Sequence, residues 1–161
     1  MNLQEYQDKL RTLSSYPPDT DASGVNAIGV AAEAGEVLGE VQSALRGRVF
    51  NLDAYLDELG DVLAYTALFA GNASIQLGDL VIARYGLIQH DHPPTITKQA
   101  RSLFHCANHL LELQGRMGES FDYSGTISCL LHAIGICAFA VNSSLEEVAE
   151  INYIKLIKKF T

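Results

Sequence analysis

The chain has 161 residues, which is enough for one compact domain with a buried core. Apolar residues make up 48% of the sequence and no segment is of low complexity, so we expect a folded chain and not a disordered one. The formal net charge of −8 argues against nonspecific binding to nucleic acid or to an anionic membrane, although a bound metal ion would still allow a nucleotide to bind.

Helical periodicity dominates the chain and strand patterns are almost absent, which predicts an all-α fold. The expected helices cover residues 3–13, 23–46, 52–71, 74–88, 96–117, 124–141 and 145–160. The last of them starts at Ser144-Leu-Glu-Glu147, a capping box in which the serine and the glutamate satisfy free backbone donors. The segment Gln89-His-Asp-His-Pro-Pro94 is expected to link two halves of a single domain over 1–161, namely 1–88 and 95–161.

Three cysteines without CxxC spacing predict buried, reduced thiols in a reducing cytosol: Cys106, Cys129 and Cys137. The N-terminal segment MNLQEYQDKL does not resemble a signal peptide. The longest apolar stretch, 127–141, is interrupted by His132 and is too short to span a bilayer. We therefore expect a cytoplasmic protein that has no membrane partner.

Two pairs of acidic residues have the same spacing. Glu33 and Glu36 lie three residues apart in AAEAGEVLGE, and Glu58 and Asp61 repeat this spacing in DELGDVLAY. Residues three apart share a helix face, and the intervening LRGRVFNLDAY is long enough for the chain to reverse, so two antiparallel helices would bring the four carboxylates together. Like charges this close raise one another's pKa unless a hard cation such as Mg²⁺ lies between them. The spacing therefore predicts a metal site.

Helical phase strengthens this prediction for Glu58. On a helical wheel it lies within about 60° of four apolar or aromatic residues, which are Tyr55, Val62, Tyr65 and Phe69. An acid at the centre of an apolar face costs free energy unless it is paired or bound to metal. Any of the other three acids, taken alone, would be interpreted as a solvated residue.

Four segments occur in an order that resembles the MazG-like nucleotide pyrophosphohydrolases: EYQDKLRT with a following YP, then IGVAAEAGEV, DELGDVLAY and SLEEVAEINYIKL. That family belongs to the all-α NTP pyrophosphatase superfamily, which also holds the dimeric dUTPases. The family signature is ExxE followed, after a loop, by ExxD, and it corresponds here to Glu33, Glu36, Glu58 and Asp61. The resemblance covers residues 3–72 and 143–157.

The resemblance implies an enzyme of the house-cleaning type. These four acids would bind Mg²⁺, with Mn²⁺ as a second candidate, and a (d)NTP would be cleaved between its α and β phosphates to a (d)NMP and pyrophosphate. Glu33 or Glu36 would orient or deprotonate the attacking water, and the sequence does not choose between them. Asn152 and Lys155 of the NxxKL element would bind the substrate.

One departure from the family concerns the second half, because about seventy residues separate the helix with the second acidic pair from the helix that carries the NxxKL element. Residues 31–42 can be aligned with 103–114, and 67–74 with 137–144. In this alignment Glu33 meets His105, Glu36 meets Asn108 and Glu58 meets Ser128, so the second half lacks the metal acids. We therefore expect an internal pseudo-dimer with a degenerate second half. A homodimer of such chains stays open.

Three functions remain open at this point: the house-cleaning pyrophosphohydrolase, a dUTPase-like nucleotide hydrolase, and a non-catalytic helical module that binds a nucleotide or a metal. The base preference is equally open. Tyr65, Phe69 and Asn72 are candidates for pocket lining, with core packing the favoured interpretation of the two aromatic residues. His105 and His109 have the i, i+4 spacing of a zinc site but fit a packed or half-exposed helix face better.

Overall fold

A computed structural model of the protein describes residues 1–80, 95–118 and 120–160. Over these residues the regular secondary structure is helical and contains no strand, which confirms the all-α prediction. The elements are α1 (Leu3–Leu13), α2 (Ala22–Leu45), α3 (Leu52–Asn72), the 3-10 turn η1 (Leu77–Asp79), α4 (Ile96–Met117), α5 (Ser124–Phe139) and α6 (Leu145–Phe160). Every predicted helix except 74–88 is present, with each end within two residues of the prediction.

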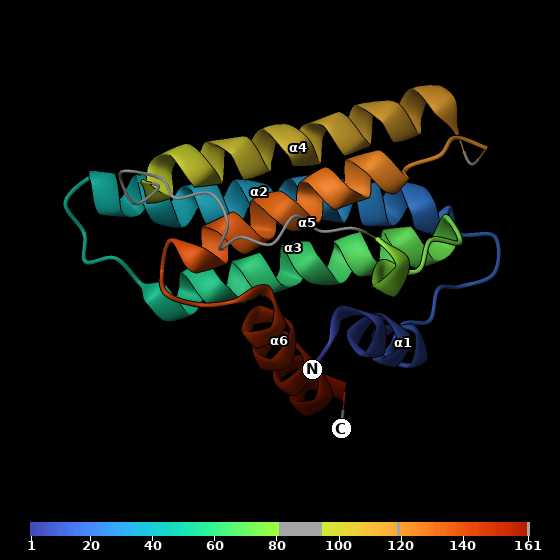
Figure 1. Ribbon diagram of the computed structural model, residues 1–161, viewed down its shortest axis with the longest axis horizontal. Helices are drawn as coiled ribbons and strands as arrows, with labels where there is room; N and C mark the ends of the chain where they lie inside the picture. Colours follow the sequence, from blue (N-terminus) through green and yellow to red (C-terminus); the bar gives the residue numbers. More distant parts are fainter. Residues whose placement is uncertain (81–94, 119, 161) are drawn as a thin grey trace.

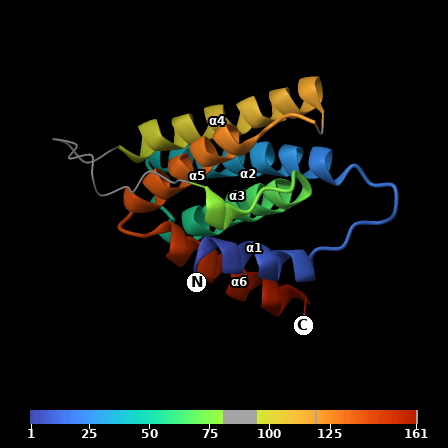
Figure 2. The ribbon, with the colours of Figure 1, turned by 45° about the vertical axis from the view of Figure 1, so that its right-hand side comes forward.

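Four of the helices, α2, α3, α4 and α5, run side by side along the long axis of the molecule (Figures 1 and 2). Helix α2 packs against α3 and α4, and α5 packs against the same two helices, so the four close into a bundle. The alignment of the two halves matched α2 with α4 and α3 with α5, and these pairs are in contact. The duplication itself stays a prediction.

The core of the bundle consists of aliphatic and aromatic side chains from all four helices. Fully buried members include Val30, Val37, Tyr55, Leu59, Leu63, Leu103, Leu110, Ile127, Leu130, Leu131 and Ile134. Along α2, α3 and α4 these residues are four or seven positions apart, which places them on one face of each helix and explains why the helical pattern was readable in the sequence. None of the helices within the described ranges combines the length and the apolar character needed to cross a membrane.

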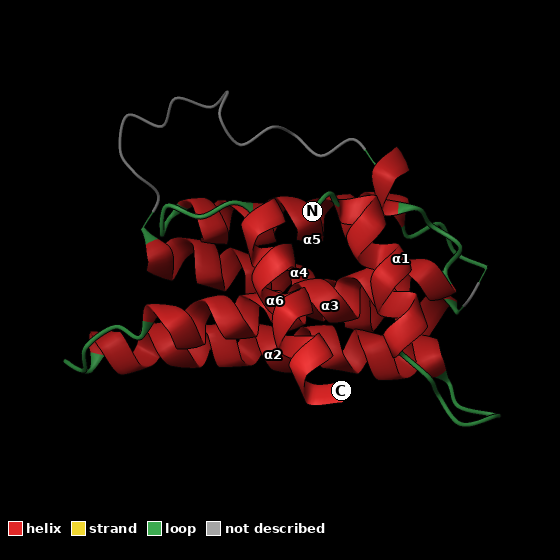
Figure 3. Cartoon of the chain, turned by 90° about the horizontal axis from the view of Figure 1, so that it is seen from below, coloured by secondary structure: helices red, strands yellow, loops and turns green. Residues whose placement is uncertain are grey.

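Helices α1 and α6 lie next to each other and pack against α3, outside the four-helix bundle (Figure 3). The N-terminal ammonium of Met1 forms an ion pair with Glu150 Oε2 at 3.0 Å, which links the start of the chain to α6. Gly60 allows α6 to approach α3 closely, because a Cβ atom at this position would lie only 2.8 Å from the Cβ of Asn152. This close approach positions α6 beside the acidic residues of α3.

The predicted helix over 74–88 is wrong where the structure describes it. Residues 74–80 form a turn and the short η1, and Ser74 has a positive φ of 58°. The side chain of Gln7 on α1 replaces the missing helical bonds: its Nε2 donates to the carbonyls of Ala67 and Ile75, and its Oε1 accepts from the N–H of Leu77. Residues 81–88 and the predicted linker 89–94 lie outside the described residues.

The ends of α5 and α6 follow local rules. The predicted capping box is confirmed, since Ser144 Oγ accepts from the N–H of Glu147 at 3.1 Å and Glu147 Oε2 accepts from the N–H of Ser144 at 2.9 Å. Helix α5 stops two residues earlier than predicted because Asn142 adopts a left-handed φ of 59° and the next N–H, that of Ser143, bonds back to the carbonyl of Ala138.

The prediction of three buried cysteines is wrong for Cys129. Cys137 is buried and Cys106 is half-buried, whereas Cys129 is exposed. All three are free thiols. Helix α5 is apolar on nearly every side, so its sequence does not show which face meets the core, and the packing of α5 on α3 and α4 leaves Cys129 outside.

Candidate metal centre

Three glutamates from two neighbouring helices converge on one point. Glu33 and Glu36 come from α2 and Glu58 from α3, and one carboxylate oxygen from each lies within 4.8 Å of the other two. Glu33 and Glu58 are half-buried and Glu36 is exposed. The prediction that the two acidic helices bring their carboxylates together is confirmed for these three residues. Carboxylate oxygens at this spacing are the donors that hard divalent cations such as Mg²⁺ prefer.

Two glutamates of the cluster, Glu33 and Glu58, have raised pKa values. Burial raises the pKa of Glu58 from its ordinary value of 4.5 to about 7, assisted by the charges of Glu36, Glu33, Asp61 and Asp57. The pKa of Glu33 is also raised, first by burial and then by Asp61 and Glu36, while a hydrogen bond with the Glu58 carboxyl partly offsets this rise. At neutral pH such a group either keeps a proton or gains stability from a bound cation.

The fourth predicted acid, Asp61, lies outside this group of three and has two other partners. Its Oδ1 accepts a hydrogen bond from Asn152 Nδ2 at 2.8 Å, and its Oδ2 accepts one from Lys155 Nζ at 2.7 Å. Both partners belong to α6, so the structure brings the NxxKL residues to the acidic face of α3. Because Asp61 raises the pKa of Glu33 and of Glu58, its charge acts on the cluster even though its oxygens do not join it.

Lys155 connects two acids of α3. Besides Asp61, its Nζ contacts Asp57 Oδ1 at 2.8 Å, so one ammonium group bridges two carboxylates one helical turn apart. Burial lowers the pKa of Lys155, but the hydrogen bonds with Asp57 and Asp61 outweigh this and raise it. Lys155 is therefore a firmly charged cation beside the acids. Asp57 was missed in the sequence because it precedes Glu58 on a turn where a solvated acid is the ordinary interpretation.

Asn152 is one of the most buried polar side chains of the protein, with 1% of its surface exposed. Its Oδ1 accepts a hydrogen bond of 2.7 Å from the hydroxyl of Tyr6, a fully buried residue of α1. The ring of Tyr6 belongs to the buried face of α1, together with Leu3 and Leu10. The partner of its hydroxyl is 146 residues away in the chain, so no local pattern could have indicated this contact.

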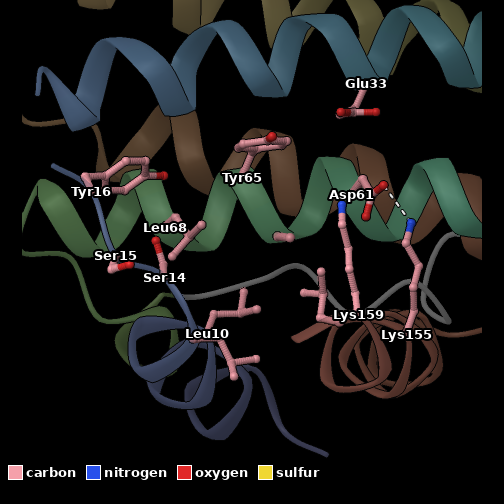
Figure 4. A pocket seen from close by; sticks show the side chains of 13 residues that line it. Leu10, Ser14, Ser15, Tyr16, Glu33, Asp61, Tyr65, Leu68, Lys155 and Lys159 are labelled. Atoms are coloured by element: carbon pink, nitrogen blue, oxygen red, sulfur yellow. Dashed lines mark hydrogen bonds and ion pairs between the residues drawn. The ribbon is translucent and has the colours of Figure 1, made fainter. Parts of the chain in front are cut away.

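A cavity of about 360 Å³ opens beside the acids, between α1, α2, α3 and α6. Its lining includes Leu10, Leu13, Ser14, Ser15, Tyr16, Glu33, Asp61, Ala64, Tyr65, Leu68, Lys155, Leu156 and Lys159. Figure 4 shows Glu33, Asp61 and the two lysines toward one end, Tyr16 with Ser14 and Ser15 toward the other, and Tyr65 between them. One end of the cavity is therefore charged, and the other combines aromatic, aliphatic and hydroxyl groups.

Tyr65 lines this cavity, whereas core packing was the favoured interpretation of its sequence position. Its ring lies directly against Gly29 of α2, where a Cβ atom would come within 2.5 Å to 2.7 Å of three ring atoms. Phe69, one turn further along α3, is buried in the core as expected. The sequence could not separate the two residues, because both lie on the same side of the helix and only the cavity distinguishes them.

The far end of the cavity contains a second feature that sequence reasoning missed. The hydroxyl of Tyr16 donates to Asn26 Oδ1 at 2.5 Å. Asn26 is fully buried in α2, and its Nδ2 has no hydrogen-bond partner within the part of the chain that the structure describes. An unsatisfied buried donor is costly. Of the two residues, Tyr16 lines the cavity and Asn26 does not.

Over its described residues, 95–118 and 120–160, the second half of the chain does not repeat the acidic cluster. His105 and His109 are both exposed on α4, whereas a packed or half-exposed face was expected, and neither belongs to a group of described residues that could hold a metal ion. The amide of Asn108, which the alignment places opposite Glu36, donates to the carbonyl of Phe104 in its own helix. Within the described ranges, the three glutamates form the one group of acids, histidines or cysteines that is close enough to hold a metal ion.

Comparisons of the chain with protein-family models, with curated proteins and with solved structures found no match. The similarity to MazG-like enzymes therefore rests on the sequence segments around the acidic pairs and the NxxKL element. The interpretation of the site rests on its geometry.

Proposed function

We propose that this protein is a divalent-cation-dependent nucleoside triphosphate pyrophosphohydrolase that cleaves a (d)NTP to a (d)NMP and pyrophosphate. The observation that supports this proposal most strongly is the convergence of three glutamates beside a cavity with a charged end and an aromatic end. A nucleotide has the same division, with a polyanionic chain at one end and a flat base at the other. The resemblance of the acidic segments to MazG-like enzymes points in the same direction.

Glu33, Glu36 and Glu58 would hold the cation, since their oxygens are close enough to share one ion and their mutual repulsion favours it. When bound, the cation would supply positive charge that offsets the charge of the triphosphate and promotes deprotonation of water. Of the three glutamates, Glu33 also lines the cavity. This favours Glu33 over Glu36 as the base that orients or deprotonates the attacking water, the choice that the sequence left open.

The remaining groups of the cavity suit the rest of the substrate. Lys155 and Lys159 lie at the charged end, where a protein of net charge −8 needs local cations to attract phosphates. Tyr65 presents an aromatic ring and Leu68 an aliphatic side chain, which suit a stacked base. Tyr16, whose hydroxyl donates to the buried Asn26, and the neighbouring Ser14 and Ser15 add polar side chains to the end of the cavity that is away from the lysines.

The test is pyrophosphate release from a panel of dNTPs and NTPs with Mg²⁺, measured for the native protein, Glu58→Gln and Glu112→Gln. Glu112 is an exposed glutamate on α4, so its substitution is the matched control. We expect release by the native protein and by Glu112→Gln, its loss on addition of EDTA, and a decrease of at least about 100-fold in Glu58→Gln. Turnover of dUTP alone would favour the dUTPase-like alternative. Cation binding without turnover of any nucleotide would contradict an enzymatic function and favour a binding module.

A further inference from the structure

Two successive hydrogen bonds connect the buried hydroxyl of Tyr6 with the acidic face of α3. The Tyr6 hydroxyl donates to Asn152 Oδ1 at 2.7 Å, and Asn152 Nδ2 donates to Asp61 Oδ1 at 2.8 Å. The three residues come from α1, α6 and α3, and the first two are almost fully buried. Nothing in the proposed chemistry uses Tyr6 directly, so its hydroxyl needs another explanation.

The chemistry of Tyr6, Asn152 and Asp61 determines which group donates and which accepts in each of these two hydrogen bonds. An ionised carboxylate accepts hydrogen bonds but cannot donate, so Asp61 requires the NH₂ side of the Asn152 amide. The carbonyl side of the amide then points away from Asp61 and needs a donor, which is the Tyr6 hydroxyl. Burial and the charge of Asp61 raise the pKa of Tyr6 well above its ordinary value, so the hydroxyl keeps the proton that it donates.

Asn152 has little room for another arrangement. It packs against Gly60, where even a Cβ atom would lie 2.9 Å from Nδ2, so the surroundings hold the amide plane but do not by themselves distinguish its oxygen from its nitrogen. That distinction depends on the two hydrogen bonds. If the Tyr6 hydroxyl were absent, Oδ1 would be left without this donor and the amide would gain freedom to turn away from Asp61.

We propose that Tyr6 is a positioning residue of the metal centre, which holds the Asp61 carboxylate in place beside the glutamates through the amide of Asn152. The inference rests on the proposed function in one respect, namely that Glu33, Glu36 and Glu58 bind a cation, whose affinity then depends on the position of the neighbouring Asp61 charge. Without the Tyr6 hydroxyl, Asp61 keeps Lys155 as its partner, and Lys155 is shared with Asp57. One oxygen of the Asp61 carboxylate would then be held by a hydrogen bond, where two are held in the native protein.

A purely structural role for the hydroxyl is the competing explanation, and the chain contains a matched control for it. Tyr123 is also buried, and its hydroxyl donates to the carbonyl of Gly118 over the same distance of 2.7 Å. It lies near Asn72, at the C-terminal end of α3, and not among the acids. Tyr6→Phe and Tyr123→Phe each remove one hydroxyl that donates a hydrogen bond of 2.7 Å, so a loss of stability is expected for both. An effect on the metal centre is expected for Tyr6→Phe alone.

The first measurement is Mn²⁺ binding by titration calorimetry to the native protein, Tyr6→Phe, Tyr123→Phe, Asp61→Asn and the Tyr6→Phe/Asp61→Asn double variant. We expect Tyr6→Phe to raise the dissociation constant about tenfold, as for other groups that orient metal ligands, and Tyr123→Phe to change it less than about twofold. In the Asp61→Asn background, Tyr6→Phe should have no further effect. Equal effects of the two tyrosine variants, or a tenfold effect that persists in Asp61→Asn, would overturn the inference.

A second measurement needs no cation. In ¹⁵N-correlated NMR spectra of the cation-free protein, the two side-chain amide protons of Asn152 should be well separated, because one of them bonds to a carboxylate. We expect Tyr6→Phe to reduce this separation and Tyr123→Phe to preserve it. Mn²⁺ binding together with an unchanged Asn152 signal in Tyr6→Phe would overturn this inference alone. If the native protein bound no Mn²⁺, the proposed function would fail, and the role of Tyr6 in a metal centre would fail with it.

Discussion

Glu58 should make the cation-free protein less stable as the pH rises through neutrality. Its pKa in the folded protein is about 7, against an ordinary value of 4.5. Below pH 4.5 the carboxyl is protonated in both the folded and the unfolded chain, so its full contribution to stability is present. Between the two values the unfolded chain releases a proton that the folded protein keeps, and the free energy of unfolding therefore falls as the pH rises. The loss is complete above the folded pKa.

The size of the effect follows from the shift and from the exposure of the site. Because Glu58 is half-buried and water screens part of the repulsion, we expect a loss of about 1 to 2 kcal/mol in the free energy of unfolding. For a domain of this size, that corresponds to a decrease of about 2 to 8 °C in Tm. Glu58→Gln removes the titration while keeping the shape of the side chain, so the variant should lack this part of the pH dependence.

The assay is thermal unfolding in EDTA at pH 5, 6, 7 and 8 for the native protein, Glu58→Gln and the exposed control Glu112→Gln. Other groups titrate as well, but most of their contribution cancels in the difference between variants. We expect the Tm of Glu58→Gln to exceed that of the native protein increasingly from pH 5 to pH 8. Excess Mg²⁺ at pH 8 should restore the native Tm and leave Glu58→Gln almost unchanged. A difference between the two proteins that stays constant with pH would refute the reasoning.

Two further predictions concern the cavity wall and the turn after α3. Gly29→Ala should displace the ring of Tyr65 and weaken nucleotide binding about tenfold. Gly39→Ala is the control, because its new Cβ would meet nothing within 4 Å. It should leave nucleotide binding unchanged and stabilise α2 by about 0.5 to 1 kcal/mol. Nucleotide titration measures the effect on binding, and urea unfolding measures the effect on stability. Equal nucleotide binding in both variants would contradict the assignment of Tyr65 to the wall of the nucleotide-binding cavity. Gln7→Ala should lower the free energy of unfolding by about 2 to 4 kcal/mol, because it leaves several buried backbone groups without partners. Urea unfolding beside Gln42→Ala, an exposed glutamine of α2, checks this, and similar losses in both would count against it.

Much of the helical architecture was predictable because the signals for it are local. The spacing of apolar residues along α1, α2 and α4 reflects which side of each helix is buried, and the capping box at Ser144 requires only four consecutive residues. The segment after α3 was mispredicted for the opposite reason. Besides its own backbone bonds, the turn over residues 74–80 is held by the side chains of Gln7 and Gln4, which belong to another helix about 70 positions earlier.

The candidate site likewise has features that the sequence predicted and features that it did not. The spacing of three within each acidic pair, and the short connection between the helices, were sufficient to predict that Glu33, Glu36 and Glu58 approach one another. The spacing does not determine which oxygen meets which partner. Asp61 has the same spacing to Glu58 as Glu36 has to Glu33, yet it turns to the amide and ammonium groups of α6.

By itself, the sequence determined the class of fold, the helix that carries each acid and the face on which each acid lies, because helical periodicity and side-chain charge act over a few residues. Only the tertiary structure decided which side chains meet across helices. The contact of Tyr6 with Asn152, the bridge of Lys155 between two aspartates and the position of Tyr65 in the cavity wall each depend on how closely two helices approach. That approach is set by packing between distant segments, at positions such as Gly29 and Gly60 where a missing side chain leaves room for a neighbour.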